Sequence, residues 1–175
     1  MINEGMENFA ETERMFLRKI SPDDLETLAR LLVDPEVMEY SLEGPLPCKR
    51  SKEIIETMID NDKKYGFGAC AVINKTTGAW MGFCSLWLKK EDGKLKTDFG
   101  YRFFKEFWGQ GYATESVSAC LQYITKRFPY LVINSYIEPD NKGSLRVAEK
   151  VGMIFVKEGV YHNLPVYVYR FVHNV

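Results

Sequence analysis

The stretch that decides the fold is Trp108-Gly109-Gln110-Gly111-Tyr112-Ala113, about two-thirds of the way along the 175-residue chain. It follows a predicted strand and opens a predicted helix, whose apolar residues recur at helical spacing from Ala113 to Ile124. Glycines let backbone N–H groups approach a ligand without obstruction by a Cβ, and a helix start adds positive partial charge. The stretch therefore predicts an anion-binding loop, with an ordinary tight turn as the alternative.

Two common nucleotide-binding loops are excluded by pattern and position. The chain has no GxxxxGK[ST] sequence, which a P-loop requires. A dinucleotide fold places its glycine loop after the first strand of a βαβ unit, with an acidic residue about 20 positions later. Here the loop comes after several predicted strands, so neither fold is expected.

The composition is that of an ordinary globular protein, with 46% hydrophobic and 27% charged residues. The net charge of -1 and the pI of about 6.2 predict neither nucleic acid nor a membrane as a partner. No apolar run approaches the roughly 20 residues that span a bilayer. The cysteines lack CxxC spacing and only two histidines are present, so we predict no metal site and expect a reducing cytoplasm.

The hydrophobic pattern predicts one domain with the element order βααβββαβαββ. We expect a polar, flexible lead-in at 1–13 and a single domain over 14–175, with Ser21 and Ser51 capping the first two helices. Strands are expected at 15–20, 68–74, 80–88, 96–104, 130–138, 153–157 and 166–172, with a polar hairpin loop at 89–95. Helices are expected after Pro22, after Ser51, and at 113–124 and 142–151. This order favours the α/β (α+β) class, with a mixed sheet and helices on its faces.

Two motifs resemble the GNAT family of N-acetyltransferases. The run from Gly100 to Glu115 resembles motif A, [Q/R]-x-x-G-x-[G/A], with Gly111 and Ala113 matching and Trp108 in the Q/R position. That tryptophan is typical of the branch that includes RimJ and RimL. The segment 139–153 resembles motif B, and the resemblance covers about residues 14 to 172. It implies a mixed, mostly antiparallel sheet of about seven strands flanked by four helices.

The resemblance also implies that acetyl passes from acetyl-CoA to a primary amine. Backbone N–H groups of the glycine loop would bind the pyrophosphate, and main-chain groups around Tyr101 and Phe103 would pair with pantetheine. The implied cofactor-binding residues are Tyr101, Phe103, Trp108, Gly109, Gln110, Gly111, Tyr112, Ala113, Thr114, Asn141 and Ser144.

The general acid is left open by the sequence. Asn141 matches the motif B asparagine expected near pantetheine, but it would equally cap a helix. Ser144 could protonate the thiolate, or it is simply a small residue chosen for close packing. Many relatives carry a tyrosine four residues before the motif B glycine, where this chain has Ala148, so the alternatives are Tyr136 or water.

The general base has two candidates. Glu158 is the better candidate because it matches the glutamate of the family's "EG" pair, and Asp98, at the start of the strand before the glycine loop, is the other. Either could act through a water molecule, and either could be an ordinary surface acid. His162 stands where relatives usually have arginine.

The acceptor is expected to contact the loop from Asp34 to Pro47 and the last hairpin, where Glu36, Glu39 and Glu43 could attract a cation. The resemblance favours a protein N-terminus as the amine substrate. The alternatives are a small amine (a polyamine, an antibiotic or an amino-acid-like amine) and a non-catalytic acyl-CoA-binding module. A homodimer is left open.

Overall fold

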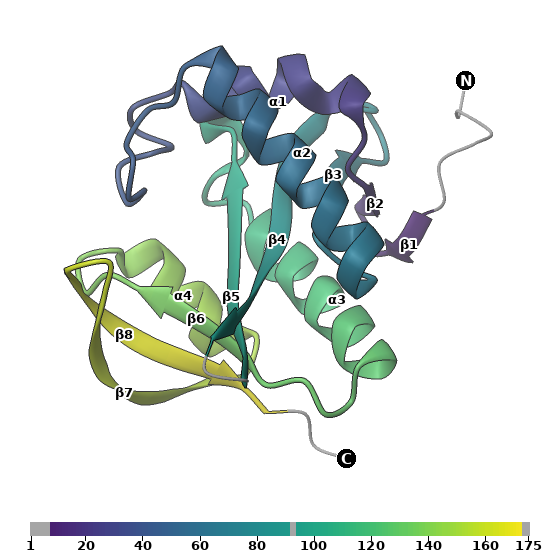
Figure 1. The fold of residues 1–175 in the computed structure, drawn as a ribbon. Coiled ribbons are helices and arrows are strands. Elements are labelled where there is room, and N and C mark those ends of the chain that lie inside the picture. The colour runs from purple at the N-terminus through teal and green to yellow at the C-terminus, as the bar shows by residue number, and fades with distance from the viewer. Residues whose placement is uncertain (1–7, 92–93, 173–175) are drawn as a thin grey trace.

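Five strands form an antiparallel sheet in chain order in the computed structural model, which describes residues 8–91 and 94–172 (Figure 1). They are β1 (Asn8–Glu11), β2 (Met15–Lys19), β3 (Ala69–Asn74), β4 (Trp80–Glu91) and β5 (Lys94–Phe103). A second antiparallel sheet has the order β6-β8-β7, from β6 (Ile133–Ile137), β7 (Met153–Tyr161) and β8 (Leu164–Phe171). The two sheets meet where β5 runs beside β6.

Helices cover both faces of the five-stranded sheet. One face packs against α1 (Leu25–Leu32) and α2 (Cys48–Tyr65), and the other against α3 (Tyr112–Arg127), while α4 (Lys142–Lys150) contacts α3 and β7 of the second sheet (Figure 1). Alternation along each strand sends successive side chains to opposite faces. Ala69 and Ala71 accordingly lie in the core under α1 and α2, whereas Cys70 and Val72 lie in the core under α3.

The predicted fold class is confirmed, with four helices and antiparallel pairing in both sheets. An eighth strand, β1, was not predicted because 1–13 was interpreted as a lead-in; Asn8–Glu11 pairs with β2. The predicted cap at Ser51 is wrong. Helix α2 begins at Cys48 with Pro47 as N-cap, and Ser51 lies buried in its first turns with no partner for Oγ. Proline at the boundary fixes the extended backbone and sets the earlier start.

The predicted hairpin loop at 89–95 is largely strand. Antiparallel pairing continues through Lys90 opposite Leu95 and Glu91 opposite Lys94, so only residues 92–93, which lie outside the described part, are left for the connection. The polar composition of this segment suggested a loop, yet the backbone ladder with β4 continues through it.

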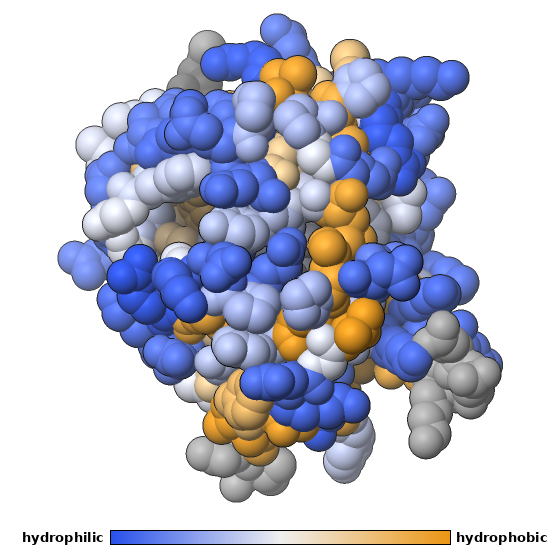
Figure 2. All heavy atoms as spheres, turned by 90° about the vertical axis from the view of Figure 1, so that its left-hand side faces the viewer, coloured by the Kyte–Doolittle hydropathy of each residue, from blue (hydrophilic) through white to orange (hydrophobic). Residues whose placement is uncertain are grey.

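The surface is mostly hydrophilic with one notable apolar strand. In Figure 2, viewed from the side that faces left in Figure 1, hydrophobic residues form a band right of centre, and a further group lies near the bottom of the face. Strand β7 exposes Ile154, Phe155, Val156 and Val160. No helix among the described residues is long and apolar enough to cross a membrane.

Candidate active site

The site is a seam between β5 and β6, which share no backbone ladder. At the start of β5, side chains join the strands instead: Thr97 Oγ1 donates to Val132 O at 2.8 Å and accepts from the N–H of Asn134 at 2.9 Å. Ser135 Oγ donates to Phe99 O at 2.7 Å. Beyond this point the strands diverge (Figure 1), so the rest of β5 presents an edge that no strand covers.

The register of β5 determines which backbone groups face this open edge. The N–H of Phe104 donates to Met81 O of β4 at 3.0 Å, and groups on alternate residues of a strand point to opposite sides. Tyr101 and Phe103 therefore direct their N–H and C=O groups away from β4, although Trp108 Nε1 already donates to Phe103 O at 2.8 Å. The N–H and C=O groups of Tyr101 and the N–H of Phe103 are left free of β4, and pairing of pantetheine with them stays a prediction.

The glycine loop leads directly into α3. Gly109 and Gly111 have positive φ angles of 72° and 81°, and Gly111 is the N-cap residue of the helix. A Cβ added at Gly109 would meet no atom within 4 Å, so the space beside this backbone is open. Tyr112, Ala113 and Thr114 form the first helical turn, whose N–H groups have no partner within the helix. This arrangement can hold an anion.

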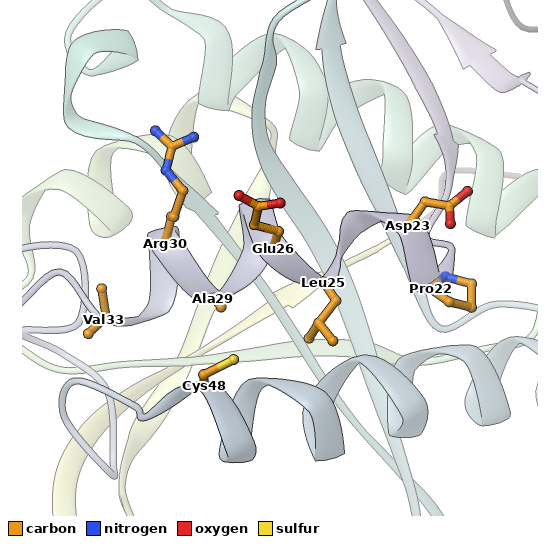
Figure 3. Close-up of a pocket in the computed structure, with 8 residues that line it drawn as sticks. All are labelled: Pro22, Asp23, Leu25, Glu26, Ala29, Arg30, Val33 and Cys48. Atoms are coloured by element: carbon orange, nitrogen blue, oxygen red, sulfur yellow. The ribbon is translucent and has the colours of Figure 1, made fainter.

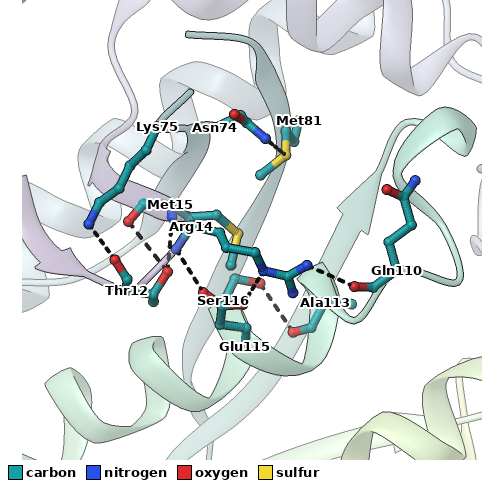
Figure 4. Close-up of polar contacts among 10 residues, drawn as sticks. All are labelled: Thr12, Arg14, Met15, Asn74, Lys75, Met81, Gln110, Ala113, Glu115 and Ser116. Carbon is teal, nitrogen blue, oxygen red and sulfur yellow. Dashed lines mark hydrogen bonds and ion pairs between the residues drawn. The ribbon is translucent and has the colours of Figure 1, made fainter. Parts of the chain in front are cut away.

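Arg14, which precedes β2, lies against the loop (Figure 4). Its Nε donates to Glu115 Oε2 at 2.7 Å, its backbone N–H donates to Glu115 Oε1 at 3.2 Å, and Nη1 donates to Gln110 O at 3.0 Å. The guanidinium lies 4.2 Å from the Tyr112 ring centre. Nη2 would lie 3.4 Å from a Cβ added at Gly111. A cation thus stands beside the predicted phosphate site.

On the α4 side, the predicted acid candidate Ser144 contacts Asn141 and Tyr101. Asn141 caps α4, accepting from the N–H of Ser144 at 3.0 Å through Oδ1. The Tyr101 hydroxyl donates to Ser144 Oγ at 3.4 Å, and burial raises the pKa of Tyr101. Ala148 is buried, and its methyl side chain has no acidic proton to donate. A tyrosine hydroxyl therefore reaches the site from β5, paired with Ser144.

Asp98 lies on the opposite face of β5, half-buried beside β6. Burial raises the pKa of Asp98 to about 6, although hydrogen bonds from the Tyr161 hydroxyl and the Tyr136 N–H, together with the charges of Arg102 and His162, lower it. The Tyr136 and Tyr161 rings stack with centres 4.3 Å apart. Asp98 is therefore a carboxyl group with a pKa of about 6 that lies beside the residues of an aromatic stack.

The loop 34–47 reaches across to this side of the seam. Met38 Sδ lies 3.1 Å from Arg102 Nε, and the Tyr40 hydroxyl donates to Asp140 O, before α4, at 3.3 Å. The β7–β8 hairpin turns through His162 and Asn163, both with positive φ, as a two-residue turn requires. Both segments that the sequence assigned to the acceptor thus border the region around Asp98.

Glu158 is placed differently from Asp98. It sits on β7 opposite Tyr167, its side chain is exposed, and it makes no hydrogen bond or ion pair with any residue in the described ranges. Of the two carboxylates predicted as base candidates, Asp98 alone has the partly buried, hydrogen-bonded surroundings that shift the pKa of a catalytic carboxyl group.

Sequence reasoning missed three groups: the Arg14 guanidinium, the Tyr101 hydroxyl and the Tyr161 hydroxyl. Alternation along β5 could have separated Tyr101 from Asp98 and Arg102, since odd and even positions face opposite sides. No local pattern signals Arg14 or Tyr161, because tertiary packing alone brings them to the seam.

Two other features lie outside this seam. The sulfur atoms of Cys70, Cys84 and Cys120 lie within 4.8 Å of one another in the core, where burial raises the pKa of the Cys70 and Cys120 thiols. A surface hollow between α1 and the start of α2 is lined by mostly apolar atoms and includes none of the predicted site residues (Figure 3). It is lined by Pro22, Asp23, Leu25, Glu26, Ala29, Arg30, Val33 and Cys48.

The glycine loop before a helix, beside an open strand edge, is the arrangement of an acyl-CoA-dependent acetyltransferase. Residues 14–154 match the model of the acetyltransferase (GNAT) domain, so the chain belongs to this family and is an acyltransferase that uses acetyl-CoA. It is 35% identical over 160 residues to the uncharacterized protein YkkB of Bacillus subtilis, covering 91% of this chain and 92% of that one. An uncharacterized N-acetyltransferase, p20 of Bacillus licheniformis, is 27% identical, with 85% and 83% covered.

Solved structures share the fold. A GNAT acetyltransferase from Bacillus anthracis superposes with a TM-score of 0.77 at 25% identity, covering 93% of this chain and 97% of that one. A structure named RimL, ribosomal L7/L12 alpha-N-protein acetyltransferase, in complex with coenzyme A, gives a TM-score of 0.77 at 16% identity, with 95% and 98% covered. The likeness to RimL extends to the fold and no further.

Proposed function

We propose that this protein transfers acetyl from acetyl-CoA to a primary amine at the seam between β5 and β6. The observation that carries the proposal is the uncovered edge of β5, which lies between the glycine loop of α3 and the half-buried Asp98. One ligand could lay its phosphates on the loop and its extended arm along the edge. Its reactive end would then lie between the Tyr101–Ser144 pair and Asp98.

The residues present fit coenzyme A. The space beside Gly109 is open, so a pyrophosphate could approach this backbone without meeting a Cβ. Arg14 and the first N–H groups of α3 would complement its charge. The amides of pantetheine would pair with Tyr101 and Phe103 as an added strand. When bound, acetyl-CoA supplies the thioester carbonyl that the amine attacks.

Asp98 is the proposed base. An amine is mostly protonated at neutral pH, and a carboxylate with a pKa near 6 is ionised there and can accept its proton, directly or through water. On the other side of the seam, Tyr101 and Ser144 would supply the proton for the leaving thiolate. The N–H of Phe103 or Tyr101 would donate to the thioester oxygen as negative charge develops on it.

Two kinds of amine are proposed as acceptors. A protein N-terminus follows from the resemblance to the RimJ and RimL branch, and proteins of that name acetylate a ribosomal protein. A small amine is favoured by a specific observation: the β7–β8 hairpin turns through two residues, His162 and Asn163, so little chain is available to embrace a peptide.

Thiol release from acetyl-CoA with a panel of amines tests the proposal. The panel should hold peptides with free N-termini, amino acids, polyamines and aminoglycosides, each at several pH values. We expect steady release well above the amine-free rate with at least one class. A folded protein that binds acetyl-CoA but releases no thiol with any acceptor would instead be a binding module.

A further inference from the structure

Arg102 is a charged residue on the acceptor side of the seam that the roles proposed so far do not use. It lies on β5, opposite Phe83 of β4 and four residues after Asp98. The side chains of Arg102 and Asp98 therefore leave β5 on the same face. That face is opposite to the one on which Tyr101 meets Ser144. The Arg102 side chain is half-buried beneath the loop 34–47.

The guanidinium of Arg102 forms no ion pair within 4 Å among the residues of the described ranges, although the charge of Asp98 acts on it. Its one polar contact is from Nε to Met38 Sδ at 3.1 Å, and a thioether is a weak acceptor. In contrast, three other arginines form ion pairs at 2.9 Å or less: Arg14 with Glu115, Arg18 with Asp24, and Arg50 with Glu43 and Glu53.

The terminal nitrogens of Arg102 are not fully enclosed, although the residue is half-buried. The fully buried side-chain polar atoms that lack a partner in the described part of the chain are Ser51 Oγ and Trp80 Nε1. Because the Arg102 nitrogens are not among these atoms, solvent or a ligand can reach them. Burial lowers the pKa of Arg102 while the charge of Asp98 opposes this, so the unpaired cation carries a desolvation cost that a bound anion would relieve.

Two of the three acids expected to attract a cation, Glu36 and Glu43, form ion pairs. Lys105 pairs with Glu36 at 2.8 Å and with Asp34 at 3.3 Å, and Arg50 pairs with Glu43 at 2.9 Å. The charges of Glu39, Glu138 and Asp140 still act on Tyr40 of this loop, but Arg102 adds a positive charge beside Asp98. A polyamine, which offers only positive charge, would meet this cation as a repulsive neighbour.

We infer that the acceptor carries a carboxylate beside its reactive amine, as a free α-amino acid does, and that Arg102 binds this carboxylate. The inference rests on the proposed function and names its substrate class. A guanidinium matches a carboxylate through two parallel N–H···O bonds, which fixes the orientation of the acceptor. The amine of the same molecule would then face Asp98, whose charge acts on Arg102 across the same space.

Matched acceptor pairs that differ only in the carboxylate test this assignment. We would measure kcat/KM for L-leucine against 3-methylbutylamine, and L-phenylalanine against phenethylamine, over a range of pH because the two amines of a pair titrate differently. The wild type should prefer the amino acid at least tenfold. Arg102→Met should reduce this preference to within about threefold, and Arg102→Lys should retain part of it. Arg127→Met, an exposed arginine at the end of α3, should leave the preference unchanged.

Calorimetric titration of the same acceptors into the CoA-bound protein tests the contact without turnover. The amino acid should bind at least tenfold more tightly to the wild type than to Arg102→Met, while the amine should not distinguish them. Equal use of both members of each pair, or a preference for a peptide over the amino acid, would overturn the assignment while leaving the acetyltransferase function intact. Absence of thiol release together with Arg102-dependent amino acid binding would overturn the proposed function alone.

Discussion

Arg14 and Glu115, 101 residues apart in sequence, form a two-point contact that ties the start of β2 to the first turn of α3. Burial alone would raise the pKa of Glu115, but hydrogen bonds from Thr12 and Arg14 outweigh this and hold the pKa below its usual value. Glu115 therefore stays ionised beside the predicted phosphate site. The guanidinium of Arg14 forms an ion pair with this carboxylate at 2.7 Å and so offsets its negative charge.

Removal of Arg14 should weaken the binding of coenzyme A. In Arg14→Met the carboxylate of Glu115 is left unpaired near the phosphates, so we expect about a tenfold loss of affinity, on the order of 1.4 kcal/mol. The double variant Arg14→Met/Glu115→Gln should recover part of it, because the repulsive charge is gone. Calorimetric titration with coenzyme A and with pantetheine separates charge from general loosening of the fold. A similar loss for pantetheine, which has no pyrophosphate, would contradict the electrostatic role.

The glycine loop offers a matched pair of substitutions. Gly109 and Gly78 have nearly equal φ angles, 72° and 71°, and a Cβ at either would meet nothing within 4 Å. Gly109→Asp and Gly78→Asp therefore introduce the same backbone strain and the same charge. Only Gly109→Asp should lower the affinity for coenzyme A, by tenfold or more, while thermal unfolding should shift equally in both. Equal affinity in the two variants would remove the loop from the cofactor site.

The local parts of this architecture could be predicted because local chemistry determines them. The glycine loop, the helix after it and the strand before it follow from Gly109, Gly111 and the apolar spacing of α3. Strand β1 was missed, because its residues Asn8–Glu11 gain strand structure only by pairing with β2. Ser51 was misassigned because a serine that precedes a helical stripe can equally lie inside a helix that a proline has already started.

The acceptor side illustrates why sites are harder to predict than folds. Asp98 was a candidate by its position, but its surroundings come from Tyr136 and Tyr161, which reach it from the second sheet. Glu158 matched a family position, and nothing in its sequence neighbourhood indicated that its side chain would be exposed. Burial and partner geometry depend on how the two sheets meet, and no sequence spacing encodes that contact directly.

The Tyr101–Ser144 pair predicts a shared role in proton delivery. If the Tyr101 hydroxyl acts through or together with Ser144, then Ser144→Ala and Tyr101→Phe should each lower kcat about tenfold or more, with little change in acetyl-CoA affinity. The double variant should be no worse than the more impaired single variant, because the two hydroxyls act as one unit. Tyr130→Phe, whose side chain is 97% exposed, is the control. Unchanged turnover in both single variants would assign the proton to water.

Asp98 predicts the shape of the pH–rate profile. The carboxyl must be ionised to accept a proton, and its pKa is about 6, so kcat/KM should rise as the pH increases through 6 and level off above it. Asp98→Asn should abolish this limb and lower kcat/KM roughly 100-fold on the plateau. Glu158→Gln is the matched control, expected to stay within about threefold of the wild type. A profile that keeps its limb near pH 6 in Asp98→Asn would assign the titration to another group.

The raised pKa of Asp98 also predicts how the stability of the fold depends on pH. Because the folded state holds this proton more tightly than the unfolded chain, whose pKa is near 3.8, the stabilisation from protonated Asp98 is complete below about pH 4. It is lost as the pH rises through 6. Above that pH the buried charge disfavours folding, so Asp98→Asn should unfold no more easily than the wild type at pH 8. We would compare the two forms by denaturant unfolding at pH 8. Equal stability would show that the variant is folded and that its loss of activity comes from the missing carboxylate. A markedly less stable Asp98→Asn variant would mean that the ionised carboxylate stabilises the contact between β5 and β6. The loss of activity could then not be assigned to a missing base.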